Sequence, residues 1–276
     1  MADDVKKEKV VTDSFIMNYF RFGHGPKPFV ILPGISLLSV MNFADAVADA
    51  YKVLTDDYTI YVFEPQNEIT ESFSIREVMD DTIEALRMLG LGKVTLMGAS
   101  YGGMTSMMLA AEHPEQVENL ILCGTSAYVS DERYRIFEHW ISLVDEGDAE
   151  ALYQDFGKIV YPHSIYEQSK DVLSEMAKGV TADDMDRFRH HLESIRGFDV
   201  RESLNKIDSR VFIVSSSDDM VFGTEGLQSI ADNMVSCPKL KIKIYDGCGH
   251  AVYDTAPDLK ERILRFLKNE DDQEEK

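Results

Sequence analysis

The chain has 276 residues, of which 44% are hydrophobic, a length and apolar content sufficient for one large α/β domain with a buried core. Its 28 basic and 49 acidic side chains give a formal net charge of −21. A surface this acidic repels a polyanionic backbone, which argues against a nucleic-acid partner.

The ends of the chain are charged. Residues 1–12 lack the apolar stretch of a signal peptide, and the longest apolar run, residues 29–40, is interrupted by Pro33 and Gly34 and is too short to span a bilayer. The three cysteines are too sparse for a disulfide framework or a metal cluster. We therefore expect a cytoplasmic protein without membrane association. Residues 269–276 are mostly acidic and are predicted to form a disordered tail.

Short apolar runs alternate with amphipathic stretches in the first half of the chain, a pattern typical of parallel β-α-β units. Ser74 and Glu77 have the spacing of a capping box at the start of a helix that ends near Gly90. A second helix of small and apolar residues is expected at 101–112. Strands are expected at residues 14–22, 29–32, 58–63, 94–97 and 120–123.

The pattern changes after residue 127. Residues 128–200 show helical periodicity and no convincing strand, and strands return at 211–214 and 240–245. Thr255 is expected to cap a last helix, because Pro257 follows near its first turn. The sequence thus predicts an α/β core domain made of residues 1–127 and 201–268, with an all-helical cap formed by residues 128–200.

Residues 98–102, Gly-Ala-Ser-Tyr-Gly, match the pattern G-x-S-x-G. A serine on a very tight strand-to-helix turn presents its hydroxyl in a strained conformation, and side chains two residues before and after it would collide. The expected strand at 94–97 and helix at 101–112 supply this context. Ser100 is therefore the candidate nucleophile, and a glycine-rich turn with an idle serine is the bland alternative.

On these residues the chain resembles the α/β-hydrolase superfamily, in particular bacterial single-domain serine hydrolases with a helical cap. The resemblance extends from about residue 15 to 267. It implies a mostly parallel eight-stranded sheet flanked by helices, with nucleophile, acid and base in that chain order. A serine at this turn argues against haloalkane dehalogenases and epoxide hydrolases, which would have aspartate there.

The resemblance assigns the base and the acid. His250 follows the strand-like run 240–245 and a glycine turn, as the family's histidine does, whereas a buried structural histidine is the alternative. The family has a small residue after the preceding strand and the aspartate three residues later. Ser216 occupies the small position, usually glycine, so the acid is Asp219, with Asp218 as the less favoured choice. The carboxylate orients the imidazole, which in turn activates the serine.

Two backbone amides are expected to stabilise the negative oxygen of a tetrahedral intermediate. One is the N–H of Tyr101, directly after the nucleophile. The resemblance places the other at Ile35, although Pro33-Gly34 stands where the family usually has His-Gly. Ser36 is a candidate for an additional side-chain donor.

The substrate pocket is less well specified. After the strand at 58–63 the family often has Asp-x-Arg-Gly-x-Gly-x-Ser, but residues 63–70 are Phe-Glu-Pro-Gln-Asn-Glu-Ile-Thr, so the pocket rim is expected to differ. Some of the large apolar residues in the cap should shape an apolar pocket: Phe137, Trp140, Phe156, Tyr161, Met176, Met185 and Phe188.

Four charged or titratable residues of the cap have two interpretations each. Arg187 and Arg189 are expected to form surface salt bridges, with a substrate carboxylate as the alternative partner. His190 and His191 are expected at the surface, although either could border the substrate.

The predicted function is a serine hydrolase that cleaves a small carboxylic ester or lactone through an acyl-enzyme. The substrate is expected to carry an apolar acyl or ring portion, and no metal or organic cofactor is implied. Carbon–carbon bond hydrolysis, cofactor-free perhydrolysis and acyl transfer use the same triad and remain open. A non-catalytic ligand receptor on the same fold is the alternative from another class. The sequence does not indicate an oligomeric state.

Overall fold

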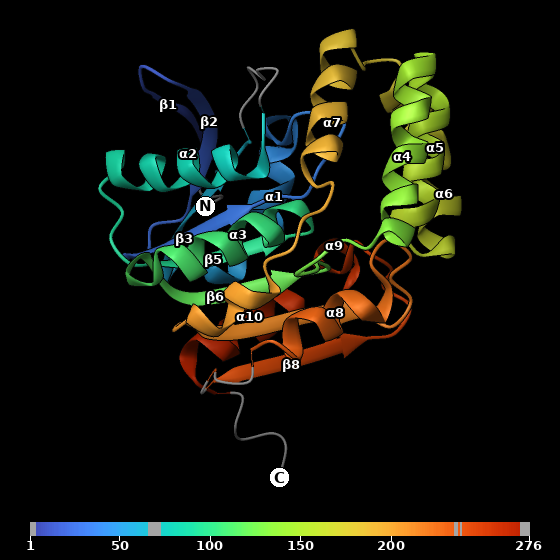
Figure 1. Cartoon of the computed structure of the whole chain (residues 1–276). Helices are drawn as coiled ribbons and strands as arrows, with labels where there is room; N and C mark the ends of the chain where they lie inside the picture. The colour runs from blue at the N-terminus through green and yellow to red at the C-terminus, as the bar shows by residue number, and fades with distance from the viewer. Residues whose placement is uncertain (1–3, 66–72, 235–236, 238, 271–276) are drawn as a thin grey trace.

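The computed structural model describes residues 4–65, 73–234, 237 and 239–270. One eight-stranded sheet runs through the molecule in the order β1-β2-β4-β3-β5-β6-β7-β8 (Figure 1). The β1–β2 and β2–β4 pairs are antiparallel and the others are parallel, which confirms the predicted mostly parallel sheet. The strands are β1 (Lys6–Val11), β2 (Ile16–Phe22), β3 (Lys27–Leu32), β4 (Tyr58–Phe63), β5 (Val94–Ala99), β6 (Val117–Cys123), β7 (Arg210–Ser216) and β8 (Leu240–Tyr245).

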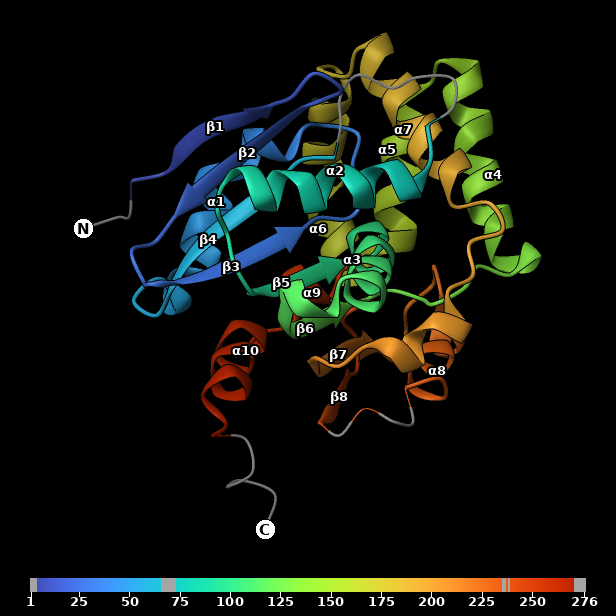
Figure 2. The same ribbon diagram turned by 60° about the vertical axis from the view of Figure 1, so that its left-hand side comes forward.

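Helices cover both faces of the sheet, and the central strands are apolar on both sides as parallel strands usually are. In β6, Leu120 and Leu122 pack into one hydrophobic cluster, whereas Ile121 between them packs into the other. The layers can be followed in Figure 2. The first cluster includes residues of α2 (Ile75–Met88), α3 (Tyr101–Glu112) and α8 (Gly223–Ala231). The second includes residues of α1 (Ala44–Ala50), α9 (Val252–Thr255) and α10 (Leu259–Lys268).

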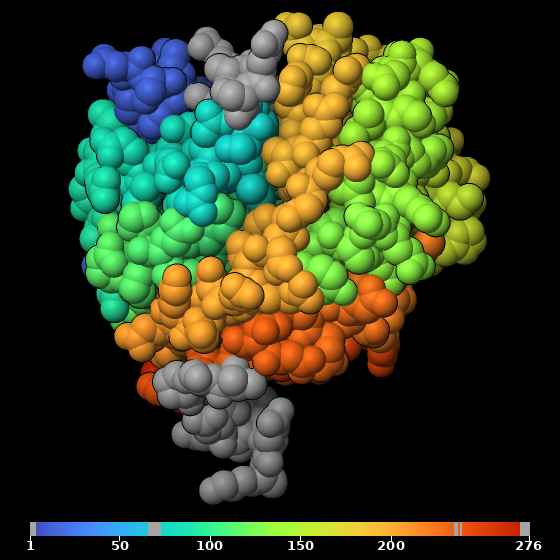
Figure 3. All heavy atoms as spheres, viewed as in Figure 1, coloured from blue at the N-terminus to red at the C-terminus, as the bar shows by residue number. Residues whose placement is uncertain are grey.

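Four helices form an insertion between β6 and β7, where the sequence predicted helices without strands. They are α4 (Asp131–Glu146), α5 (Ala149–Val160), α6 (His163–Ala177) and α7 (Ala182–Ser194). The two ends of the insertion meet in an isolated antiparallel bridge between Tyr128 and Asp199. The space-filling view shows the insertion packed directly against the rest of the chain on this side (Figure 3).

The structure can be compared with the two helix caps predicted from the sequence. Helix α2 begins with the predicted capping box: Ser74 accepts a hydrogen bond from the Glu77 amide, and the Glu77 carboxylate accepts one from the Ser74 amide. The prediction that Thr255 caps the last helix is wrong, because Thr255 ends α9 and α10 begins after Asp258. The Thr255 hydroxyl instead donates to the carbonyl oxygen of Cys248 at 2.7 Å, two residues before His250.

Parts of two predicted segments lie outside the described residues: 66–72, within the expected pocket rim, and 271–276, within the predicted acidic tail. Asn269, the first residue of that tail, ends α10 in the left-handed conformation with φ of 59°. No helix of the described part of the chain is long and apolar enough to cross a membrane.

Candidate active site

Ser100 lies on the turn between β5 and α3 and has φ of 50° and ψ of −116°. A positive φ is strained for a residue with a β-carbon and persists only where neighbours hold it, at a cost of about 1–3 kcal/mol. The Ser100 amide donates to the carbonyl oxygen of Cys123 at 3.0 Å, and the Thr125 hydroxyl donates to the Ser100 carbonyl oxygen at 2.7 Å. The strand next to β5 therefore fixes the turn on which the serine stands.

The glycines of the G-x-S-x-G motif have no room for a side chain. A β-carbon at Gly98 would lie 2.4 Å from both the carbonyl oxygen of Gly102 and the hydroxyl of Ser106. Gly34, on the loop after β3, also lies close to the serine, since a β-carbon there would be 3.2 Å from that of Ser100. Close backbone approach around Ser100 thus explains both the motif and the glycine after Pro33.

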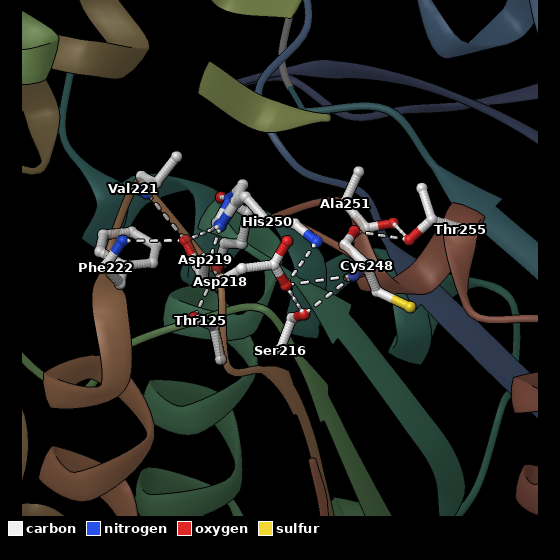
Figure 4. Close-up of polar contacts among 12 residues, drawn as sticks. Thr125, Ser216, Asp218, Asp219, Val221, Phe222, Cys248, His250, Ala251 and Thr255 are labelled. Carbon is white, nitrogen blue, oxygen red and sulfur yellow. Dashed lines mark hydrogen bonds and ion pairs between the residues drawn. The ribbon is translucent and has the colours of Figure 1, made fainter. Parts of the chain in front are cut away.

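His250 follows β8, which is separated from β5 by β6 and β7 in the sheet, and its ring extends back to the serine after β5. Its Nε2 lies 2.9 Å from Ser100 Oγ, and the side chain is buried. Asp218 holds the loop that carries His250. Its Oδ1 accepts hydrogen bonds from the amides of Cys248 at 3.1 Å and Gly249 at 3.2 Å (Figure 4). The same carboxylate accepts a hydrogen bond from the hydroxyl of Ser216.

Asp219, one residue further, faces the imidazole instead. His250 Nδ1 lies 3.1 Å from Asp219 Oδ1 and 3.0 Å from Oδ2 (Figure 4). Oδ1 also accepts hydrogen bonds from the amides of Val221 at 2.8 Å and Phe222 at 3.1 Å. Burial raises the pKa of this carboxyl, but the electrostatic interaction and hydrogen bond with His250 and the hydrogen bonds from the two amides outweigh burial and hold the pKa below its usual value of 3.8. Asp219 is therefore ionised at neutral pH.

Ile35 and Tyr101 line the same pocket as Ser100, and no hydrogen bond donated by the amide of either residue is present in the described part of the chain. Tyr101 is the first residue of α3, where helix amides lack intrahelical partners. Ser36 does not fit the predicted role of an additional donor, because its hydroxyl donates to the carbonyl oxygen of Leu38 at 2.7 Å.

Ser100 and His250 open into a pocket with about 410 Å³ of empty space. Three of the predicted cap residues line it, namely Phe137, Trp140 and Phe156. Phe188 lies behind them, with its ring centroid 6.0 Å from that of Phe156. The lining residues that the sequence analysis did not single out are Met104, Val160, Leu192, Ile195, Val221, Phe222 and Tyr253. The walls are thus almost entirely apolar next to one polar cluster, which is typical of small-molecule sites.

The cap arginines form ion pairs with carboxylates of the protein: Arg187 with Asp184 at 2.9 Å, and Arg189 with Asp145 at 2.5 Å. The expectation of a surface position is wrong for His191, which is only 5% exposed. It is buried because its ring packs edge-on against that of Tyr101, with the centroids 5.3 Å apart.

Comparisons with known proteins agree with this architecture. A family model described as "alpha/beta hydrolase fold" matches residues 27–257. A protein of Agrobacterium fabrum named "Putative carbamate hydrolase RutD" is 24% identical over 226 residues, which cover 81% of this chain and 85% of that protein. The human "Serine hydrolase BPHL" is 26% identical over 143 residues, 49% of this chain and 48% of that protein.

Solved structures show the same fold. The alpha/beta hydrolase enzyme MGS-M2 from a deep-sea metagenome library superposes with a TM-score of 0.83 at 19% identity, covering 95% of this chain and 97% of that one. The enol-lactonase of Burkholderia xenovorans LB400 gives 0.79 at 17% identity, covering 95% and 100%. The protein is a hydrolase with a small-molecule substrate, and the family model, which matches most of its length, places the chain in the α/β-hydrolase fold family.

Proposed function

We propose that the protein hydrolyses a small carboxylic ester or lactone through an acyl-enzyme on Ser100, with His250 as the base and Asp219 as the acid that orients it. The observation that carries the proposal is the continuous chain of contacts from Asp219 through both ring nitrogens of His250 to Ser100 Oγ, with distances of 3.0 and 2.9 Å. This chain of contacts ends in the apolar pocket, where a substrate carbonyl has access to the serine.

In the first half of the reaction, Ser100 Oγ attacks the carbonyl carbon and its proton passes to His250 Nε2. Asp219 accepts a hydrogen bond from Nδ1–H, which keeps the other nitrogen free to take that proton and stabilises the imidazolium that forms. The carbonyl oxygen becomes an oxyanion, and the unpartnered amides of Ile35 and Tyr101 donate to it. Each such donor contributes about 3–4 kcal/mol of transition-state stabilisation.

The tetrahedral intermediate then breaks down. The bond to the leaving oxygen breaks, the proton on Nε2 moves to that oxygen, and the acyl group stays on Ser100. Water attacks the acyl-enzyme with His250 again as base, and the carboxylic acid is released. For a lactone the leaving oxygen remains tethered to the acyl chain, so one hydroxy acid is formed.

The pocket supports the choice of a small substrate with an apolar part. Aromatic side chains form much of its wall, as is common in sites for ligands that carry apolar groups. We assign the reacting groups to a core made of residues 1–127 and 201–268, and six of the fourteen residues that line the pocket to a cap made of residues 128–200. A carbamate, as in the name of the Agrobacterium relative, has the same carbonyl group and is the second substrate class to test.

A fluorophosphonate probe tests the nucleophile independently of the substrate. We expect labelling of the folded protein and none of Ser100→Ala or His250→Ala. p-Nitrophenyl esters of increasing acyl length, a lactone series, a phenyl carbamate and a vinylogous 1,5-diketone then rank the chemistries. No labelling of the folded protein would favour a non-catalytic receptor, and turnover of the diketone alone would favour carbon–carbon hydrolysis. Product formation only in the presence of an acceptor alcohol or of peroxide would favour acyl transfer or perhydrolysis.

A further inference from the structure

A second pocket, with about 340 Å³ of empty space, adjoins the loop after β3. Ile35 lines both this pocket and the one that contains Ser100. Since the Ile35 amide is a proposed oxyanion donor, the second pocket begins next to the position of the reacting carbonyl. Its walls include side chains from three separate parts of the chain, among them Glu64, Arg187 and His191.

His191, which lines this pocket, has an unpartnered acceptor. Its Nδ1 lies 2.8 Å from the carbonyl oxygen of Arg187, and because a carbonyl oxygen only accepts, Nδ1 carries the proton. Burial lowers the pKa of this imidazole to about 4, so the ring is neutral at pH 7. Nε2 therefore has a free lone pair, and it is buried without a hydrogen-bond partner among the described residues.

Among the described residues, the neighbours of the ring do not supply a donor. The rings of Phe73 and Tyr101 pack edge-on against it, with centroids 5.0 and 5.3 Å away. The Tyr101 hydroxyl is paired with that of Ser194 at 3.1 Å. A buried acceptor left unsatisfied costs about 1–3 kcal/mol, and most buried polar groups in native proteins have a hydrogen-bond partner. A ligand in the pocket recovers this free energy if it brings a donor.

The charges around the pocket favour a neutral donor over an anion. Arg187 has both terminal nitrogens engaged, one with the Asp184 carboxylate at 2.9 Å and the other with the carbonyl oxygen of Leu37 at 2.7 Å. Glu64, a buried acidic residue, lines the same pocket. The positive charge of Arg187 is therefore compensated, and the atom that lacks a partner, His191 Nε2, is a hydrogen-bond acceptor.

We propose that the second pocket binds a hydroxyl or amide N–H in the alcohol part of the substrate, with His191 Nε2 as its acceptor. The inference rests on the proposed function, in which the apolar acyl part fills the aromatic pocket and the alcohol part extends past Ile35. The enzyme then prefers esters whose alcohol carries a donor a few atoms from the ester oxygen.

The first experiment compares kcat/KM for ω-hydroxyalkyl butyrates of two to six carbons with alkyl butyrates that have a methyl group in place of the hydroxyl. We expect the best hydroxyalkyl ester to exceed its partner about tenfold, as one well-placed hydrogen bond to a buried acceptor allows. In His191→Phe the ratio falls to near one. His190→Phe is the matched control, because His190 bonds its own helix in the same way, through the Asp186 carbonyl oxygen at 2.8 Å, but does not line the pocket; it keeps the wild-type ratio.

The second experiment leaves His191 in place and does not require turnover. The Ser100→Ala protein, labelled with ¹⁵N-histidine, is titrated with α,ω-diols of two to six carbons and with 1-pentanol, and His191→Gln assigns the resonance. We expect the Nε2 resonance of His191 to move upfield with a diol and not with pentanol.

The two experiments separate failure of this inference from failure of the proposed function. Equal hydrolysis of both ester series together with an unresponsive Nε2 would overturn the role of the second pocket and leave Ser100 chemistry intact. Absence of any ester hydrolysis with a diol-dependent Nε2 shift would overturn the ester chemistry and support the pocket.

Discussion

Gly102 packs so closely against Leu32 that a β-carbon at residue 102 would lie 2.0 Å from the Leu32 carbonyl oxygen. This contact joins the first turn of α3 to the end of β3, directly before the loop that carries Ile35. The second glycine of the motif therefore sets how close the helix after Ser100 comes to the proposed oxyanion donor on the neighbouring strand end.

Gly102→Ala should consequently destabilise the protein. Neither the strand end nor the helix can move aside without disturbing the sheet, so we expect a loss of about 3 kcal/mol in the free energy of unfolding, at the upper end for overpacked sites. Urea denaturation measures it. Gly92→Ala is the control, since a β-carbon there has nothing within 4 Å, and equal stability of the two variants would contradict the packing argument.

Substitutions of the adjacent Asp218 and Asp219 should have different effects, one on loop stability and the other on catalysis. Asp219→Asn removes the charge next to His250 Nδ1 and disturbs the tautomer, so kcat on the best p-nitrophenyl ester should fall about 10³–10⁴-fold. Asp218→Asn weakens the acceptor for the amides of Cys248 and Gly249, so it should reduce stability by about 1 kcal/mol and activity far less. Full activity in Asp219→Asn would overturn its assignment as the acid.

Asp81 on α2 should make stability depend on pH. Burial, with the nearby charges of Glu77 and Asp80, raises its pKa from 3.8 to about 6. Because the folded protein binds this proton more tightly than the unfolded chain, the residue's contribution is fully present below pH 3.8 and is lost as pH rises through 6. Asp81→Asn should therefore raise Tm by about 1–2 °C at pH 8 and have little effect at pH 3.5.

Differential scanning calorimetry at the two pH values measures the effect of Asp81. Asp80→Asn makes the same change of charge at an exposed position of the same helix and should shift Tm less. An equal shift in Asp81→Asn at both pH values would contradict the proposed cause.

Phe156 should limit the length of the acyl chain. Its ring lines the pocket with its centroid 5.0 Å from that of Trp140, so truncation to alanine opens space beyond the reacting groups. We expect Phe156→Ala to raise kcat/KM for p-nitrophenyl octanoate relative to the butyrate about tenfold. Phe43→Ala, an exposed phenylalanine outside the pocket, is the control and should keep the wild-type ratio. An unchanged ratio in Phe156→Ala would mean that the acyl group lies elsewhere.

The fold could be predicted largely because parallel strands buried on both faces are continuous apolar runs. The runs expected at residues 94–97 and 120–123 lie within β5 and β6, in which all residues but Glu118 are buried. Strand β1 was not predicted, because its residues are mostly charged and four of the six are exposed. It is a strand because β2 supplies its hydrogen bonds, and no local pattern reveals such a partner.

Local patterns also explain what was and was not predicted around Ser100. The tight turn requires glycine at fixed spacing, which makes the serine easy to find. The burial of His191 depends instead on contact with Tyr101, ninety residues earlier in the chain, and the polar spacing of its helix suggested a surface. The same holds for Thr255. Its hydroxyl could cap a helix or donate to a loop carbonyl, and it donates to Cys248 because that carbonyl oxygen lies within reach in the folded chain.

The bridge between Tyr128 and Asp199 has a consequence for how such proteins diversify. It is reinforced on both sides, by the Val129 amide on the Phe198 carbonyl oxygen and the Val200 amide on that of Ala127, each at 2.9 Å. The chain thus leaves and returns through a single point beyond the end of β6, and the segment from residue 200 then leads back to the start of the parallel strand β7. We therefore expect that a longer, shorter or differently shaped segment in place of residues 129–198 would leave the spacing of the strand ends that carry Ser100, Asp219 and His250 unchanged.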